Sequence, residues 1–225
     1  MGMVVKLVGA GVLAVAAVAS FALGYAWPGV ACAAATVAVI AWVALTLRLP
    51  PLRVKQAALT VTLEGADGRR ARVVKTQELV PLRKPLGDIR DRSLFTPGRL
   101  DDIEVSPGAV AERMGLGKYH ITKVVFKPPL PPGRPVNRTM SYVIYDGFAA
   151  ADVAFMFVGD YPTDELALTV VFPPERRPHR ARVFVRAPGR PDKPAEVTRA
   201  PDGSSLGWRL TDVKVGVQYH IEWSW

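Results

Sequence analysis

The polar residues best suited to chemistry in this 225-residue chain form a cationic cluster toward its C-terminal end. Its basic members are Arg176, Arg177, Arg180, Arg182, Arg186, Arg190 and Lys193, and the one opposing carboxylate is Asp192. A guanidinium group binds a phosphate through two parallel hydrogen bonds, and alternate residues of a strand point the same way. The cluster therefore predicts an anion-binding or headgroup-binding face formed by Arg176, Arg177, Arg180, Arg182 and Arg186.

Three interpretations of this arginine cluster remain open. The first is a site for a phosphate-bearing small ligand of the nucleotide type. The second is contact with anionic lipid headgroups, which lie close to any domain tethered to a membrane by a short linker. The third is a solvated face without a ligand. Nucleic acid is not expected as a partner, because the aromatic side chains that stack on single-stranded bases are not interleaved with these arginines.

The residues that usually perform catalysis or bind metals are sparse. His120 and His220 fall within apolar segments, His179 falls among arginines, and their spacing fits no metal site. The chain contains neither a nucleophile-elbow sequence nor a phosphate-binding glycine loop. Cys32 is the single cysteine, which excludes an intrachain disulfide and a cysteine-based metal site. We therefore expect no catalytic residue, no metal and no cofactor, and a protein that is not an enzyme.

A run of alternating acids and arginines, residues 88–104, is the remaining polar cluster. Its acids are Asp88, Asp91, Asp101, Asp102 and Glu104. We expect the run to form a loop, in which the alternation of sign produces surface ion pairs that neutralise one another. Enzymatic activity is a third-ranked alternative, since it would require several of these acids to converge with His120 on one pocket.

Two very different parts of the chain must position these polar residues. No charged residue occurs in residues 7–47, and this run of 41 residues is about twice the ~20 apolar residues that cross a bilayer once. The run is interrupted at Trp27-Pro28-Gly29, a turn-forming sequence. It therefore predicts a transmembrane helical hairpin in residues 1–49, with spans at about 7–26 and 30–47.

The cations that flank this run set its expected orientation. Lys6 precedes the run, Arg48, Arg53 and Lys55 follow it, and none lies in the connecting turn. Positively charged flanks usually stay in the cytoplasm, so we expect a multi-pass protein of the bacterial inner membrane whose remaining domain is cytoplasmic. Lys6 contributes one unit of the formal net charge of +9, so that domain carries +8. A cleaved signal peptide or a lipoprotein site at Cys32 is the alternative.

Small residues recur at intervals of four in both predicted spans. Ala16, Ser20 and Gly24 share one face of the first span, and Ala31 and Ala35 share one face of the second. Small residues at this spacing let helices approach closely within a bilayer, where lipid offers no hydrophobic driving force. These faces are therefore predicted to pack against each other, and an additional role in forming a homo-oligomer remains open.

After a proline-containing linker, residues 50–56, the pattern becomes one of alternating apolar and polar residues throughout residues 57–225. Strands with one buried face show this period of two, and they are expected at 59–64, 71–82, 118–126, 135–145, 151–158, 165–172, 181–186, 207–213 and 217–225. Residues 109–116 are the one short helix expected. Short strands separated by proline and glycine are typical of an antiparallel sandwich or a small barrel, and the sequence leaves that choice open.

A two-span hairpin followed by a β-rich domain without a catalytic signature resembles the two-transmembrane, β-strand-rich effectors of bacterial anti-phage signalling. The resemblance rests on the order and type of the segments, the spans at 7–26 and 30–47 and then the strands from Leu59 to Trp225. It implies a small barrel that senses a cyclic nucleotide, oligomerises and lets the spans disrupt the membrane. The arginine cluster or the barrel mouth would then meet the phosphate.

Two functions follow from these features as hypotheses. In the first, a non-enzymatic, membrane-anchored β-domain senses a ligand or partner and signals to its transmembrane hairpin, as a membrane-disrupting antiviral defence effector would. In the second, a membrane-anchored structural adaptor docks a partner protein through its edge strands or through the proline-rich segment 127–134. The expected partners are thus the lipid bilayer, a nucleotide-type small ligand, a second copy of the chain and a partner protein.

Overall fold

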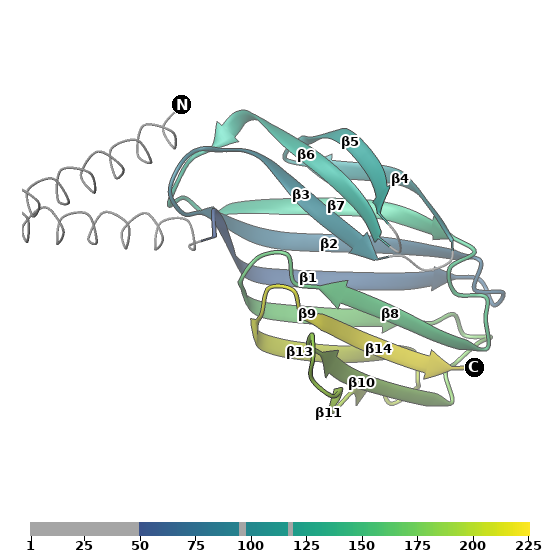
Figure 1. The fold of residues 1–225 in the computed structure, drawn as a ribbon. Helices are drawn as coiled ribbons and strands as arrows, with labels where there is room; N and C mark the ends of the chain where they lie inside the picture. Colours follow the sequence, from purple (N-terminus) through teal and green to yellow (C-terminus); the bar gives the residue numbers. More distant parts are fainter. Residues whose placement is uncertain (1–49, 95–97, 117–118) are drawn as a thin grey trace, which may run out of the picture. The chain divides into compact units, whose positions relative to one another are not determined.

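The computed structural model describes residues 50–94, 98–116 and 119–225 (Figure 1). The hairpin predicted in residues 1–49 lies outside the described residues, together with its helix-packing positions, and stays a prediction. Within the described part of the chain, no helix is long and apolar enough to cross a membrane. Residues 51–225 form one unit.

All regular elements among the described residues of this unit are β-strands. In chain order they are β1 (Leu52–Glu64), β2 (Arg70–Pro81), β3 (Leu86–Leu94), β4 (Arg99–Ser106), β5 (Ala109–Leu116), β6 (Tyr119–Leu130), β7 (Val136–Tyr145), β8 (Asp152–Val158), β9 (Thr163–Val171), β10 (Arg180–Arg186), β11 (Lys193–Ala195), β12 (Thr198–Arg199), β13 (Ser205–Val213) and β14 (Gln218–Ser224). The strands expected from alternation are confirmed, except that β1 begins at Leu52, so that most of the expected linker is already strand.

The strands form two layers. One layer is a seven-stranded sheet with the order β12-β13-β9-β1-β2-β7-β4, and the other contains a four-stranded sheet, β11-β10-β14-β8, and a three-stranded sheet, β3-β6-β5. The two smaller sheets approach each other at β8 and β3 and lie over the same face of the large sheet (Figure 1). The all-β prediction is therefore confirmed, and the open strand order identifies a sandwich.

The expectation of purely antiparallel sheets is wrong at the centre of the large sheet. β1 pairs with β2 antiparallel but with β9 parallel, from Val54 opposite Thr163 to Thr62 opposite Val171. A parallel pair needs a long connection, and here the connection includes β2 to β8. The sheet is consequently mixed, with the first strand of the domain in its interior.

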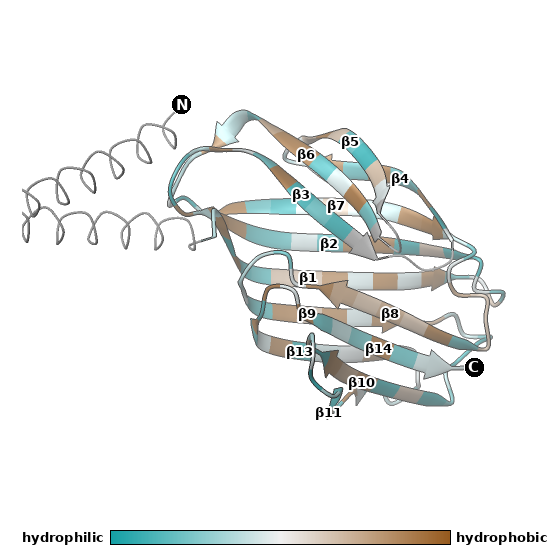
Figure 2. Ribbon diagram, viewed as in Figure 1, coloured by the Kyte–Doolittle hydropathy of each residue, from teal (hydrophilic) through white to brown (hydrophobic). Residues whose placement is uncertain are grey.

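Side-chain alternation explains which face of each strand is buried. Leu59, Val61 and Leu63 of β1 are buried, while the residues between them face away from the second layer. Figure 2 shows this alternation of hydrophobic and hydrophilic residues along β1 and β6. Where β1 begins, a bulge between Val54 and Gln56 shifts the pairing by one residue, so that the buried residues on both sides of it face inward.

Aromatic side chains fill the core beneath β14. Trp223 packs against Phe148 at a ring-centroid distance of 5.7 Å, against Phe172 at 5.5 Å and against Trp225 at 6.0 Å. The last two contacts are edge-on, the geometry that the charge distribution of aromatic rings favours. The alternating aromatic and aliphatic residues at the C-terminal end of the sequence are thus the anchor of the four-stranded sheet.

Two expectations about local structure are wrong. Residues 109–116 form β5 rather than a helix, because pairing along β6 outweighs the preference of a few helix-forming residues in a segment of two helical turns. Residues 88–104 form most of β3 and β4 rather than a loop. In both segments charged residues interrupt the alternation of apolar and polar residues by which a strand is recognised in the sequence.

The turn between β1 and β2 yields a stability prediction. Gly68 has a φ of +66°, and a Cβ atom there would lie 2.3 Å from the carbonyl oxygen of Phe148. Gly133 has a similar φ of +72° with no atom within 4 Å of its Cβ position. We expect Gly133→Ala to cost about 1 kcal/mol through backbone strain alone, and Gly68→Ala to cost roughly 1–3 kcal/mol more because it also overpacks the turn.

Thermal unfolding of the full chain in detergent tests this difference. A domain of this size loses about 2–4 °C in its midpoint per kcal/mol, so the two variants are expected to separate by several degrees. Equal midpoints for the two variants would show that the turn yields to the added methyl group.

Candidate functional site

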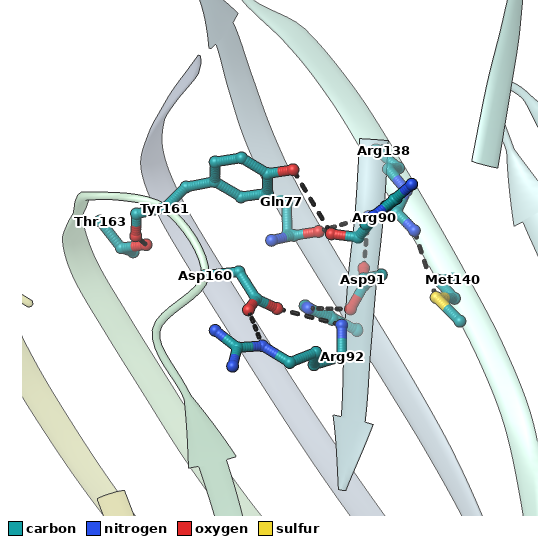
Figure 3. Close-up of polar contacts among 10 residues, drawn as sticks. Gln77, Arg90, Asp91, Arg92, Arg138, Met140, Asp160, Tyr161 and Thr163 are labelled. Atoms are coloured by element: carbon teal, nitrogen blue, oxygen red, sulfur yellow. Dashed lines mark hydrogen bonds and ion pairs between the residues drawn. The ribbon is translucent and has the colours of Figure 1, made fainter. Parts of the chain in front are cut away.

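A cluster of buried charged and amide side chains lies between the two layers (Figure 3). Lys75 and Gln77 come from β2, Arg138 from β7, and Asp91 from β3 of the opposite layer. The Asp91 carboxylate accepts hydrogen bonds from Lys75 Nζ and Arg138 Nη1, each at 2.7 Å, and Arg138 Nη1 also donates to Gln77 Oε1 at 2.8 Å. Arg138 is 1% exposed and Asp91 4%. We call these four side chains the buried ion cluster.

The strand period places these polar groups in the core. Lys75 and Gln77 occupy inward positions of β2, between the buried Val73 and Leu79. Arg138 occupies an inward position of β7 and is the direct ladder partner of Gln77. A shift of one residue in this pairing would move the inward side chains of the shifted strand to the other face and break the cluster, so the cluster also fixes the register.

The charges of the cluster determine its protonation. Burial on its own raises the pKa of Asp91, but the positive charges and hydrogen bonds of Lys75 and Arg138 outweigh burial and bring that pKa down to about 2. The carboxylate is therefore ionised at neutral pH. The ammonium group of Lys75 also lies 5.5 Å from the ring centroid of Phe157, where the ring face attracts a cation.

A second ion pair extends the cluster toward the β8–β9 turn (Figure 3). The carboxylate of Asp160 accepts a hydrogen bond from the backbone N–H of Arg92 at 3.0 Å and forms an ion pair with the guanidinium group of the same residue. Burial raises the pKa of Asp160, against the lowering effect of these bonds from Arg92. Tyr161 Oη donates to the carbonyl oxygen of Arg90 at 3.4 Å. The turn is thereby fastened to β3.

This arrangement can hold charge but has no room for a substrate. The cavity beside the buried ion cluster has a volume of about 10 Å³, which is at most the space of one water molecule. Both oxygens of the Asp91 carboxylate are already engaged. We therefore regard the cluster as a clamp that holds β3 against β2 and β7.

The arginines predicted to bind an anion are spread over two locations. Arg176 and Arg177 precede β10 and bind backbone carbonyl oxygens, Arg176 Nη1 that of Ala66 at 2.9 Å and Arg177 Nη1 that of Phe172 at 2.8 Å. The guanidinium group of Arg176 also stacks 4.1 Å from the ring centroid of Trp225. These two side chains therefore hold the ends of the strands together.

Arg180, Arg182 and Arg186 lie together on the outer face of β10. Arg182 pairs with Glu222 and Arg186 with Asp192, each at 2.6 Å. Arg180 is exposed and forms no ion pair with any described residue. The sheet face here is hollowed to a volume of about 830 Å³. An anion would thus have to compete with two carboxylates, and the anion site stays a prediction.

The acidic run behaves in part as the sequence suggests. Asp88 pairs with Lys123 at 3.9 Å, and Asp101 pairs with Arg99 at 3.6 Å and with Arg113 at 3.8 Å. The prediction of pairs within the run is confirmed for Asp101 with Arg99, whereas the partner of Asp88 lies outside the run, on β6. It is wrong for the acid of the buried ion cluster, which the period of β3 turns inward. Within the described chain, no group of three or more acidic, histidine or cysteine side chains could hold a metal ion.

Sequence reasoning missed a groove on the outer face of the seven-stranded sheet. Side chains from five neighbouring strands form two rows across it, as the pairing register shows. The first row is Asn137, Glu78, Gln56, Glu165 and Thr211. The second row is Thr139, Thr76, Ala58, Ala167 and Arg209. We call this hollow, with a volume of about 700 Å³, the outer-face groove.

Small side chains create the depth of this groove. Ala58 and Ala167 are neighbours on β1 and β9, at the centre of the sheet, and longer side chains flank them on either side. The polar row contains two carboxylates; Glu78 pairs with Lys55 at 3.5 Å, while Glu165 is exposed and unpaired within the described chain. Arg209 in the second row is exposed and forms no ion pair with any described residue. The groove therefore offers hydrogen-bonding groups, one unpaired negative charge and one unpaired positive charge.

Comparison with known proteins adds little to this geometry. No protein-family model matches the chain, and no curated protein matches it. Solved structures of an M1 zinc metallopeptidase from Deinococcus radiodurans are similar at 14% identity, over 76% of this chain and 42% of that one, with TM-scores of 0.40 and, for a mutant bound to a Tyr-Ser-Ala substrate, 0.42. The chain thus spans less than half of that enzyme, and so weak a likeness supports no argument about function. The resemblance to anti-phage effectors stays a prediction.

The buried ion cluster yields a prediction about stability. Replacing the carboxylate by an amide in Asp91→Asn leaves two buried cations without their counter-charge, and we expect a loss of about 3–5 kcal/mol at neutral pH. The matched control is Glu222→Gln, which breaks the exposed pair with Arg182 and is expected to cost at most about 1 kcal/mol. Denaturant unfolding of the full chain in detergent measures both, and similar losses would contradict the clamp.

The pKa of this carboxylate adds a dependence on pH. A pKa lowered to about 2 in the folded state, from 3.8, stabilises the fold fully above pH 4 and progressively less as the pH falls toward 2. Asp91→Asn lacks this contribution, which is on the order of 2 kcal/mol. The difference in unfolding free energy between the two proteins is therefore expected to narrow between pH 4 and pH 2. A constant difference would show that the carboxylate keeps its ordinary pKa.

Proposed function

We propose that this protein is a membrane-anchored recognition module whose β-sandwich binds an extended segment of a partner polypeptide in the outer-face groove. The observation that supports this proposal is the groove itself, a hollow of about 700 Å³ on the face of the large sheet that the second layer leaves uncovered. A concave surface with a few convergent polar groups is the usual form of a binding site.

The lining indicates the chemistry of the occupant. Carboxylate, amide and hydroxyl groups and the guanidinium group of Arg209 line it, and aromatic residues are absent from the described lining, so the stacking platform for bases is missing. Its two rows run across the strands over small side chains, and an extended backbone with hydrogen-bonding groups fits such a floor. Glu165 would attract a lysine or arginine of the partner.

The edges of the sheets are poorer docking sites than this groove. Of the edge strands, β11 and β12 contain only three and two residues, and short edge strands are a common means of preventing strand addition. The longer edge strands approach one another, β3 beside β8 and β4 beside β5. The proline-rich segment proposed as a docking loop is partly incorporated into β6, which continues to Leu130. An adaptor function would therefore also use the face of the sheet.

The position of β1 supports a role in signalling. Gln56 and Ala58 of this strand lie in the floor of the groove, and the same strand continues through Pro50 into the apolar segment that we propose to anchor the protein. An occupant would thus contact the strand that is joined directly to the membrane hairpin. No further structural element would be needed to connect binding of a partner with a response of the membrane segment, because β1 takes part in both.

Filling the groove tests this function. A photoreactive amino acid in place of Thr139 is expected to form a covalent adduct with the partner in cells, and Ala167→Trp in the same chain should reduce that adduct by tenfold or more because an indole occupies the floor. The matched control is Ala154→Trp, the same substitution on the outer face of β8.

A covalent adduct alone does not show that the partner occupies the groove, so the adduct must be lost specifically in Ala167→Trp. Adducts that persist in Ala167→Trp, or that disappear equally in Ala154→Trp, would show that the groove does not hold the partner. Glu165→Lys should weaken the adduct as well, if the partner brings a positive charge to the polar row.

A further inference from the structure

The turns at one end of the sandwich are joined to the point where the described chain begins. The backbone N–H of Leu82 donates to the carbonyl oxygen of Pro51 at 3.0 Å, and the N–H of Gly133 donates to that of Pro81 at 2.7 Å. These bonds link the β2–β3 and β6–β7 turns to the start of β1.

Two more turns lie at the same end, next to the β10–β11 turn, because Arg186 is opposite Gln218. The N–H of Val54 donates to the carbonyl oxygen of Pro162 at 2.9 Å, and the N–H of Gly159 to that of Val217 at 3.1 Å. The β8–β9 and β13–β14 turns therefore lie beside the start of β1 as well (Figure 1). We call the four turns the entry rim: residues 82–85, 131–135, 159–162 and 214–217.

The entry rim is cationic. Its four turns contain Arg83, Lys84, Arg134 and Lys214 and a single carboxylate, Asp160. That carboxylate is turned toward β3 and held by the ion pair described above. Lys214 is paired with Asp212, just before the β13–β14 turn, whereas Lys84 and Arg134 are exposed and form no ion pair with any described residue. Positive charge therefore dominates the surface that the rim presents.

Exposed apolar side chains accompany these cations. Among the described residues, the large hydrophobic side chains most exposed are those of Val215 at 54%, Leu82 at 41% and Met114 at 36%. The first two belong to the entry rim. Cations next to exposed aliphatic groups are typical of surfaces that lie in the interface of a membrane, where the aliphatic groups enter the headgroup layer.

We propose that the entry rim lies against the anionic surface of the bilayer, with Lys84 and Arg134 on the headgroups and Leu82 and Val215 entering the interface. The proposal rests on the membrane anchor of the proposed function. The uncharged run ends at Leu47, five residues before β1 begins, and five extended residues span at most about 18 Å. The rim is thus kept within reach of the surface.

Two cationic surfaces of the domain could face the bilayer, the entry rim and the arginine cluster that begins at Arg176, and their positions distinguish them. Arg176 is bound to Ala66 in the β1–β2 turn, at the opposite end of β1 from Leu52. A strand of this length spans roughly 40 Å, several times the screening length of about 8 Å in physiological salt. The rim and the end of the arginine cluster at Arg176 and Arg180 therefore cannot both face the bilayer, and the chain enters at the rim. Arg186 lies opposite Gln218, at the rim end of β10, and its guanidinium group is held by Asp192.

A fluorescent reporter at the rim tests the proposal in the full chain. Cys32→Ala removes the native thiol, and Val215→Cys then accepts an environment-sensitive dye. In nanodiscs of phosphatidylcholine mixed with phosphatidylserine, we expect the dye emission to shift to the blue and to be quenched by spin-labelled lipid, compared with nanodiscs of phosphatidylcholine alone. A dye at Ala149→Cys, in the β7–β8 turn at the opposite end, should respond to neither change.

Charge reversal at matched positions identifies the cationic surface responsible. Lys84→Glu with Arg134→Glu is expected to lower the ratio of docked to undocked domain at least fivefold for each cation removed, the effect typical of one Lys or Arg near an anionic leaflet. Arg69→Glu with Arg180→Glu changes the same charge at the opposite end and should leave the Val215 dye response unchanged.

Each other result overturns part of the scheme. Docking of the rim on lipid is refuted if the emission of the Val215 dye does not change with phosphatidylserine, or changes only when a partner protein is added. It is also refuted if charge reversal at Arg69 and Arg180 changes the dye response more than charge reversal at Lys84 and Arg134. Alkaline extraction tests the anchor separately. A chain released by alkali would refute the anchor, while the same dye read on phosphatidylserine vesicles would still decide whether the rim binds the bilayer surface.

Discussion

The arrangement of the two layers depends on the ion pairs that the Asp91 carboxylate forms with Lys75 and Arg138. Lys75 and Arg138 are buried on the inner face of the large sheet, and an unpaired charge at such a depth is far more costly than a paired one. Because the carboxylate comes from the other layer, β3 cannot shift or detach without separating these charges. The neighbouring Arg92 and Asp160 then carry the same constraint into the β8–β9 turn.

Sequence reasoning succeeded where structure is set by neighbouring residues and failed where it is set by distant ones. Alternation in residues 59–64 and 217–225 identified strands and their buried faces, because the period of two is local. The parallel pairing of β1 with β9 left no local trace, since the two strands are about a hundred residues apart in the sequence. Residues 109–116 form a strand because they pair with β6, and the local sequence contains no sign of that pairing. The local sequence alone therefore predicted a helix.

The same distinction applies to the functional residues. Ile89 and Asp91 share one face of β3, so the period of two could have indicated an inward carboxylate, but the alternating charges around it suggested a surface loop. The groove was beyond sequence reasoning, because Ala58 and Ala167 become neighbours only once the register is known. The groove and the clamp share strands β2 and β7. Along each of these strands the residues of the clamp face inward and alternate with residues of the groove, which face outward. A rigid inner face therefore supports the outer one, which lowers the cost of ordering a site on binding.

The interior position of β1 has a mechanical consequence. A force that pulled the N-terminal segment away from the domain would act along β1, which is bonded to β2 on one side and to β9 on the other. Hydrogen bonds on both sides would be loaded together in shear rather than opened one after another from an edge. Tension transmitted through Pro50 would therefore be resisted by the hydrogen bonds on both sides of β1 at once.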